Sequence, residues 1–212
     1  SKSYNDVKDI YLDENGEGPR VEKHDCVGHI GKRMYRALDN FRLKTKGKHS
    51  DGKHVGGSKG CLTKGKTGAI GRLSDLYRSA IYNNVDKNTT TRQEVTGAVD
   101  KMHDAIQAVL HHSCKISDND ERHKYCSDNG WCQFKNDRHK PHHLDAVFLD
   151  LLQPIFNRLS EASMLERCLG GFSQNQNESF NSLIWKRCPK HVWRGPLQIN
   201  LAANLSVLQW NV

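Results

Sequence analysis

Apolar residues recur along this chain at helical spacing, in segments that polar loops separate. Side chains three and four residues apart share one face of a helix, so each segment predicts a helix with one buried stripe. We predict helices over residues 3–12, 27–43, 64–82, 92–111, 144–159, 160–168, 175–187 and 197–210. A short strand is expected over 20–26, between a turn and a helix. Pro154 should kink or break the helix that contains it.

The helix that begins at Asn175 carries one carboxylate, Glu178, on its polar side. At about 100° per residue, Glu178, Asn181, Ser182 and Trp185 fall opposite an apolar face. That face consists of Phe180, Leu183 and Ile184. One interpretation is an ordinary helix in which Asn175 and Glu178 form a capping box. The other is a carboxylate held on a rigid element as a hard ligand for a divalent cation.

Composition narrows the class of protein. The chain has 212 residues, 36% of them hydrophobic, and a formal net charge of +8. This predicts a globular protein with long polar loops and an anionic partner. Its seven cysteines are odd in number and unevenly spaced, which favours thiols or metal ligands over a disulfide framework. No apolar run approaches the roughly 18 residues of a membrane-spanning helix.

Positive charge is concentrated between residues 32 and 72, where twelve Lys and Arg side chains face two Asp, a net charge of ten. The glycine-rich middle of this segment predicts a loop that contacts DNA phosphates, although such segments also occur as solvated loops. We assign DNA binding to Lys44, Lys46, Lys48, Lys53, Lys59, Lys64 and Lys66. Residues 60–67 match the P-loop pattern, but Val55 is the only aliphatic residue in 44–59, so the strand that a P-loop requires is missing.

Two groups of Cys and His residues have metal-ligand spacing. His123, Cys126 and Cys132 form a candidate zinc site, with His112 or Cys114 as the fourth ligand. The alternative is an exposed polar loop with free thiols, since the spacing matches no standard zinc finger. Cys26 and His29 lie three residues apart at the start of the helix over 27–43, although two ligands do not hold a zinc ion alone.

Several sequence blocks resemble, in their order, the catalytic domain of Mutator-like transposases of the animal type. They are the Cys-x-x-His and Lys-Arg block at 25–34, the loop at 126–132, the Pro-Ile-Phe block at 154–156, Cys168-Leu169, and the Asn-Glu-Ser-Phe-Asn block within 174–190. The first and last blocks are the most specific. The resemblance extends over nearly the whole chain.

The resemblance implies an RNase H-like fold in which three acidic residues hold two Mg²⁺ or Mn²⁺ ions for DNA cleavage and strand transfer. Glu178 then matches the third acid. Cys26 and His29 match the Cys-x-x-His motif that follows the strand after the second acid. The first two acids are expected upstream of Ser1, so we expect this chain to be inactive by itself, with the early strands of the fold missing.

We therefore expect a mainly helical chain within the α/β class, a partial RNase H-like transposase fold with a large helical insertion. The core would comprise 1–40 and 169–212, and the insertion 41–168. The expected function is that of a DNA transposase fragment acting on transposon ends and target DNA in the nucleus, as a single chain or a homo-oligomer. Two alternatives stay open: a domesticated, non-catalytic DNA-binding protein derived from a transposase, and a zinc-stabilised helical interaction module.

Overall fold

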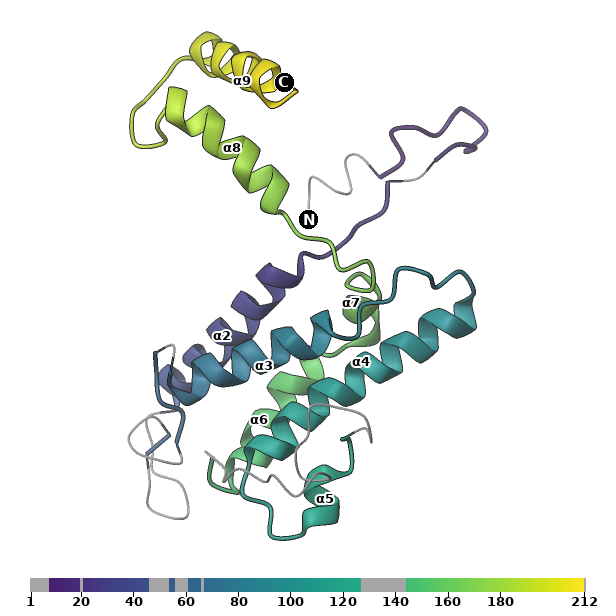
Figure 1. The fold of residues 1–212 in the computed structure, drawn as a ribbon, viewed down its shortest axis with the longest axis vertical. Helices are drawn as coiled ribbons and strands as arrows, with labels where there is room; N and C mark the ends of the chain where they lie inside the picture. The colour runs from purple at the N-terminus through teal and green to yellow at the C-terminus, as the bar shows by residue number, and fades with distance from the viewer. Residues whose placement is uncertain are drawn as a thin grey trace. The chain divides into compact units, whose positions relative to one another are not determined.

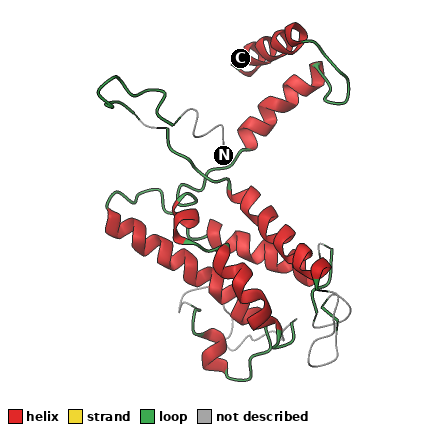
Figure 2. Ribbon diagram, turned by 180° about the vertical axis from the view of Figure 1, so that it is seen from behind, coloured by secondary structure: helices red, strands yellow, loops and turns green. Residues whose placement is uncertain are grey.

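The computed structural model describes residues 8–19, 21–45, 54–55, 61–65, 67–126 and 144–211. Helices dominate these residues, as predicted, and Figure 2 shows no strand among them. An isolated parallel bridge pairs Cys114 with Leu144. The chain divides into two compact units, Ser1–Phe172 and Ser173–Val212, and each is described by itself below. No helix in the described part combines the length and the apolar content that a membrane crossing requires.

The first unit is a helical assembly built around its longest helix, α4 (Figure 1). Its described helices are α2 (Val27–Lys44), α3 (Ala69–Tyr82), α4 (Arg92–Ser113), α5 (Asn119–His123), α6 (Phe148–Arg158) and α7 (Ala162–Glu166). Helix α3 packs between α2 and α4, and α4 also contacts α5, α6 and α7. Since α2 and α3 share one hydrophobic core, the helix of the predicted core segment 1–40 packs directly against the predicted insertion.

Apolar side chains at helical spacing form this core, as the sequence predicts. Ile30, Met34 and Leu38 on α2 are fully buried. Two buried hydrogen bonds join α3 to neighbouring helices. The Ser74 hydroxyl donates to the Gly31 carbonyl of α2 at 2.7 Å, and the Tyr77 hydroxyl donates to the Leu159 carbonyl at the end of α6 at 2.5 Å. Buried side-chain hydrogen bonds of this kind favour one packing arrangement over others.

The second unit is an antiparallel pair of helices, α8 (Asn175–Arg187) and α9 (Pro196–Trp210). Phe180 near the start of α8 packs edge-on against Trp210 at the end of α9, with ring centroids 5.8 Å apart. Arg187 at the end of α8 reaches the last two turns of α9. The fully buried side chain of Ser206 faces α8.

Two expected elements near the N-terminus are wrong. Of the helix predicted over 3–12, the described residues 8–11 form a turn, and residues 1–7 lie outside the described part. The strand predicted over 20–26 is irregular over 21–26. Its backbone groups bond to separate segments, Val21 N–H to the Lys8 carbonyl and Asp25 N–H to the Arg167 carbonyl, so no ladder forms.

Helix α3 begins at Ala69, five residues later than predicted, because glycines shape a turn before it. Gly65 has a φ of +106°, and a Cβ on Gly68 would lie 2.5 Å from the Thr63 carbonyl oxygen. The Thr63 hydroxyl accepts a hydrogen bond from Ala69 N–H at 2.9 Å, which satisfies one of the free donors of the first turn. The helix therefore starts only after this compact turn.

Three further helices differ in detail from prediction. Helix α6 runs through Pro154 without a break, and α7 is shorter than expected. The capping box expected at Asn175 is wrong, since α8 begins after Gln174 with no side-chain cap.

A complete capping box occurs instead at α4, between Thr91 and Glu94. The backbone N–H groups of Thr91 and Thr90, which bond to the Glu94 carboxylate, lower the pKa of Glu94 to about 2.

Candidate functional site

A buried carboxylate fixes the chain immediately before the Cys-x-x-His motif. Asp25 accepts hydrogen bonds from Arg167 Nε at 2.9 Å and from Arg33 Nη2 at 3.0 Å. Burial raises the pKa of Asp25, but the hydrogen bond from Arg167 and the charge of Arg33 outweigh it and hold that pKa below its ordinary value. The start of α2 is thereby tied to the end of α7.

Cys26 and His29 occupy the start of α2 that this ion pair orients. Cys26 is the N-cap residue, and its carbonyl accepts from His29 N–H at 3.0 Å and from Ile30 N–H at 3.1 Å. Both Cys26 and His29 are partly buried. The predicted positions on the helix are confirmed, and their catalytic role stays a prediction.

Glu178 lies in the first turn of α8, in the second unit. Its side chain is exposed, as are those of Asn181, Ser182 and Trp185, whereas Phe180 is partly buried, so the predicted polar face is confirmed. Glu178 is the only carboxylate side chain in residues 173–212. A metal site built on Glu178 therefore needs further acidic ligands from outside this unit.

One solvent-facing side of α2 is basic from residue 32 to the end of the helix at residue 44. At 100° per residue, positions 32, 33, 36, 40 and 44 fall within an arc of roughly 120°. They hold Lys32, Arg33, Arg36, Asn40 and Lys44, all exposed. The buried stripe of α2 occupies the opposite side. We call Lys32, Arg33, Arg36 and Lys44 the basic face.

Most of the basic face is not neutralised. Among the described residues, Lys32, Arg36 and Lys44 form no ion pair with a carboxylate, and Arg33 shares Asp25 with Arg167. Asp39 is the only acidic residue of α2 and lies at the edge of this arc, roughly 20° from Lys32, where it pairs with Arg42 and Lys64 instead. These cations are consequently available to an external anion.

Asp39 holds two cations of the predicted DNA-binding segment. It pairs with Arg42 at 2.7 Å and with Lys64 at 3.4 Å, and the hydrogen bond from Arg42 is the main reason why the pKa of Asp39 is lowered. Lys44 and Lys64, two of the predicted DNA-binding residues, are exposed. The other predicted residues lie outside the described part: Lys46, Lys48, Lys53, Lys59 and Lys66.

The sequence-based assignment missed Lys32 and Arg36. It relied on the density of lysines in the loop, whereas the relevant signal was their spacing of four residues on an amphipathic helix. That spacing stacks two cations on the solvent side of α2.

The predicted zinc ligands come together in part. His123 at the end of α5 lies next to Cys126, with Nδ1 and Sγ 3.7 Å apart. The rings of His112 and His123 meet edge to face, with centroids 5.0 Å apart. Cys114, two residues after His112 in the sequence, is fully buried. Cys132 lies outside the described part. Within the described residues, no group of three or more Cys, His, Asp or Glu side chains has the geometry of a metal site.

The His123–Cys126 pair fits two vertices of a zinc tetrahedron. Zinc bonds of about 2.3 Å to sulfur and 2.05 Å to nitrogen, at a tetrahedral angle, place the two ligand atoms about 3.6 Å apart. The 3.7 Å separation of Nδ1 and Sγ is close to that distance. The pair would supply two ligands of the predicted zinc ion, and a complete site requires two more.

The profile of the Mutator-like transposase family matches residues 1–132. Because the match extends over more than half of the 212 residues, the chain belongs to the Mutator-like transposase family. This confirms the resemblance seen in the sequence. The match includes the Cys-x-x-His block and the basic face but ends before Glu178. No curated protein and no solved structure matches the chain.

Proposed function

We propose that this chain forms part of the catalytic domain of a DNA transposase. The basic face of α2 and the loop that follows it bind DNA phosphates, and Glu178 is one acidic ligand of the catalytic metal site. The observation that supports the proposal most strongly is the un-neutralised basic face on a helix inside the region that matches the family.

The basic face suits a phosphate backbone better than a protein partner. Its cations extend over residues 32–44, about 18 Å of helix, and phosphates along a DNA strand are similarly regular. Contacts of this kind position the protein without reading base sequence. The flanking lysines of the predicted loop add to the same charge.

Glu178 has the donor chemistry that a catalytic divalent cation requires. A hard cation such as Mg²⁺ or Mn²⁺ takes oxygen ligands, and Glu178 presents a carboxylate from a helix rather than from a loop. When bound in pairs, such ions lower the pKa of a nucleophilic hydroxyl or water and stabilise the leaving oxygen. Glu178 would hold the ion in position while the basic face holds the DNA.

A zinc ion at His123 and Cys126 is a separate proposal, supported by the 3.7 Å separation of their ligand atoms. His112 and Cys132 would complete the site. The role of this ion would be structural, because α5 has only five residues and a metal can stabilise a segment that buries little apolar surface.

Action on chromosomal DNA would place the protein in the nucleus, and transposon ends would bind a single chain or a homo-oligomer.

Salt dependence of duplex binding tests the DNA contact. The 212-residue chain is titrated into a fluorescent 20-base-pair duplex at several salt concentrations, and affinity should fall steeply as salt rises, with a logarithmic slope of about −0.9 for each phosphate contact. Changing Lys32 and Arg36 together to Ala should make the slope shallower by about two.

The matched control is the double change of Lys87 and Lys101 to Ala, which removes two exposed lysines of the same unit outside the basic face. This control should leave the slope unchanged. A wild-type affinity that does not respond to salt, or equal effects of both double variants, would contradict the assignment of the basic face.

A further inference from the structure

The last turn of α8 and the loop that joins it to α9 combine positive charge with exposed aromatic rings. We refer to residues 185–194 together as the α8–α9 loop, which contains Lys186, Arg187, Lys190 and Arg194. Against these four cations, the whole segment 173–212 offers the single carboxylate of Glu178. The loop is therefore strongly cationic, and neither the Cys-x-x-His motif nor the metal site proposed above accounts for it.

Arg187 is held in place without being neutralised. Its Nη1 donates to the Leu183 carbonyl at 3.2 Å and to the Ser206 hydroxyl at 3.3 Å, and its Nη2 donates to the Gln209 side-chain oxygen at 2.7 Å. All three acceptors are neutral, so the guanidinium keeps its full charge while its conformation is restricted. A cation fixed in this way loses little entropy when it binds an anion.

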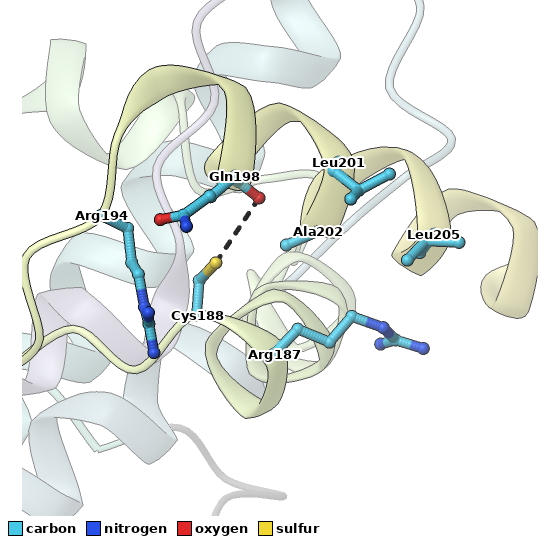
Figure 3. A pocket seen from close by; sticks show the side chains of 7 residues that line it. All are labelled: Arg187, Cys188, Arg194, Gln198, Leu201, Ala202 and Leu205. Carbon is cyan, nitrogen blue, oxygen red and sulfur yellow. Dashed lines mark hydrogen bonds between the residues drawn. The ribbon is translucent and has the colours of Figure 1, made fainter.

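A hollow lies beside Arg187, between the end of α8 and the first turns of α9. Its volume is about 370 Å³, within the range of pockets that bind small organic groups. Figure 3 shows Arg194 and Arg187 on either side of Cys188, and apolar side chains of α9 extending beside them. The lining residues from α9 are Gln198, Leu201, Ala202 and Leu205. The hollow thus offers an apolar surface between two cations.

Two tryptophans flank these cations. Trp193, next to Arg194, is 88% exposed, which is unusual for the largest apolar side chain. Trp185 is partly exposed, and Lys190 Nζ lies 4.8 Å from the centre of its ring, a cation–π contact. Exposed aromatic rings beside cations are the combination that binds unpaired nucleotides, because bases stack on the rings and phosphates pair with the charges.

We infer that the α8–α9 loop binds unpaired DNA, with a base stacked on Trp193 and the adjoining phosphates held by Arg187 and Arg194. The inference rests on the proposed transposase function and adds a single-stranded partner to it. Paired bases in a duplex hide their faces in the stack, so only an unpaired base can use the exposed indole. The four cations favour this anionic partner over an apolar protein surface.

Binding of a fluorescent 15-nucleotide thymidine strand by the 212-residue chain tests the inference, with a duplex of equal length measured in parallel. Trp193→Ala should weaken single-strand binding about tenfold and change duplex binding less than about twofold. Trp193→Phe keeps an aromatic ring and should restore most of the single-strand affinity. Leu197→Ala removes another highly exposed apolar side chain at the start of α9 and should have no effect.

The outcomes separate this inference from the proposed function. Unchanged single-strand binding by a folded Trp193→Ala protein, or equal losses on both DNA forms, would overturn the inference while duplex binding persists. A glutamate-rich peptide that displaces the strand as well as unlabelled DNA does would also overturn it, in favour of an acidic protein partner. Failure to bind either DNA form would instead contradict the proposed function itself.

Discussion

The carboxylate of Asp25 accepts a hydrogen bond from Nε of Arg167 at 2.9 Å, although 142 residues separate the two in the chain. The backbone repeats the contact, because Asp25 N–H donates to the Arg167 carbonyl and Val27 N–H donates to the Phe172 carbonyl. The first unit therefore ends beside the start of α2, and the segment that carries Glu178 begins at the next residue, Ser173. This contact joins the residue just before the Cys-x-x-His motif to the C-terminal end of the predicted insertion (residues 41–168).

Asp25→Asn should destabilise the first unit by about 1–2 kcal/mol, because charged hydrogen bonds to a buried carboxylate are lost while solvent still screens the partly exposed arginines. Urea unfolding at pH 7 measures the change. Asp75→Asn is the matched control, since Asp75 forms an exposed pair with Arg78 and should cost less than about 0.5 kcal/mol. Equal stability of the two variants would contradict the structural role of Asp25.

The same substitution has a predictable pH dependence. The pKa of Asp25 is lower in the folded protein than its ordinary value, so its ionised form stabilises the fold above the unfolded pKa of about 3.9. That contribution is lost as the pH falls through the lowered folded pKa. The difference between wild type and Asp25→Asn should therefore be full at pH 6–7 and vanish in strong acid.

Tyr77→Phe should destabilise the protein by about 1–2 kcal/mol, because the Leu159 carbonyl loses the donor that bonds to it at 2.5 Å in the core. Tyr82→Phe, five residues further along the chain, removes a hydroxyl from an exposed ring and should be neutral within about 0.5 kcal/mol. The comparison is made from the midpoints of urea unfolding. A neutral Tyr77→Phe would show that this buried hydrogen bond contributes little.

Sequence periodicity predicted the helices that carry a continuous apolar stripe. Helices α2 and α4 appear within two residues of their predicted ends, because Ile30, Met34 and Leu38 on α2, and their counterparts on α4, repeat at three and four residues. The sequence also predicted the polar side of α8 with Glu178 on it. These features depend only on local spacing.

Features that depend on distant or backbone contacts were not predictable. In the irregular segment at 21–26, Asp25 bonds to Arg167. No local sequence pattern identifies a partner that lies 142 residues away in the chain. The late start of α3 depends on the close approach of the Gly68 backbone to Thr63, which composition does not reveal. The basic face was present in the sequence at Lys32 and Arg36 but required a helical projection to be recognised.

For the proposed zinc site, elemental analysis of the purified chain should find about one zinc ion per protein, and His123→Ala should abolish it. His103→Ala is the control, because His103 lies on α4 beside Asp104 and should not affect metal content. A chelator should lower the thermal stability of wild type but not of His123→Ala. A metal-free protein whose unfolding is unaffected by chelator would contradict the proposal.

The central claim, that Glu178 belongs to a DNA-cleaving metal site, is tested most directly by Mg²⁺-dependent strand cleavage. The assay uses protein that carries the complete set of acidic metal ligands, on DNA carrying the ends of the element. Glu178→Gln should abolish cleavage and leave DNA binding within about twofold of wild type, whereas Glu161→Gln, a change at another exposed carboxylate, should cleave normally. Retained cleavage by Glu178→Gln would contradict the account.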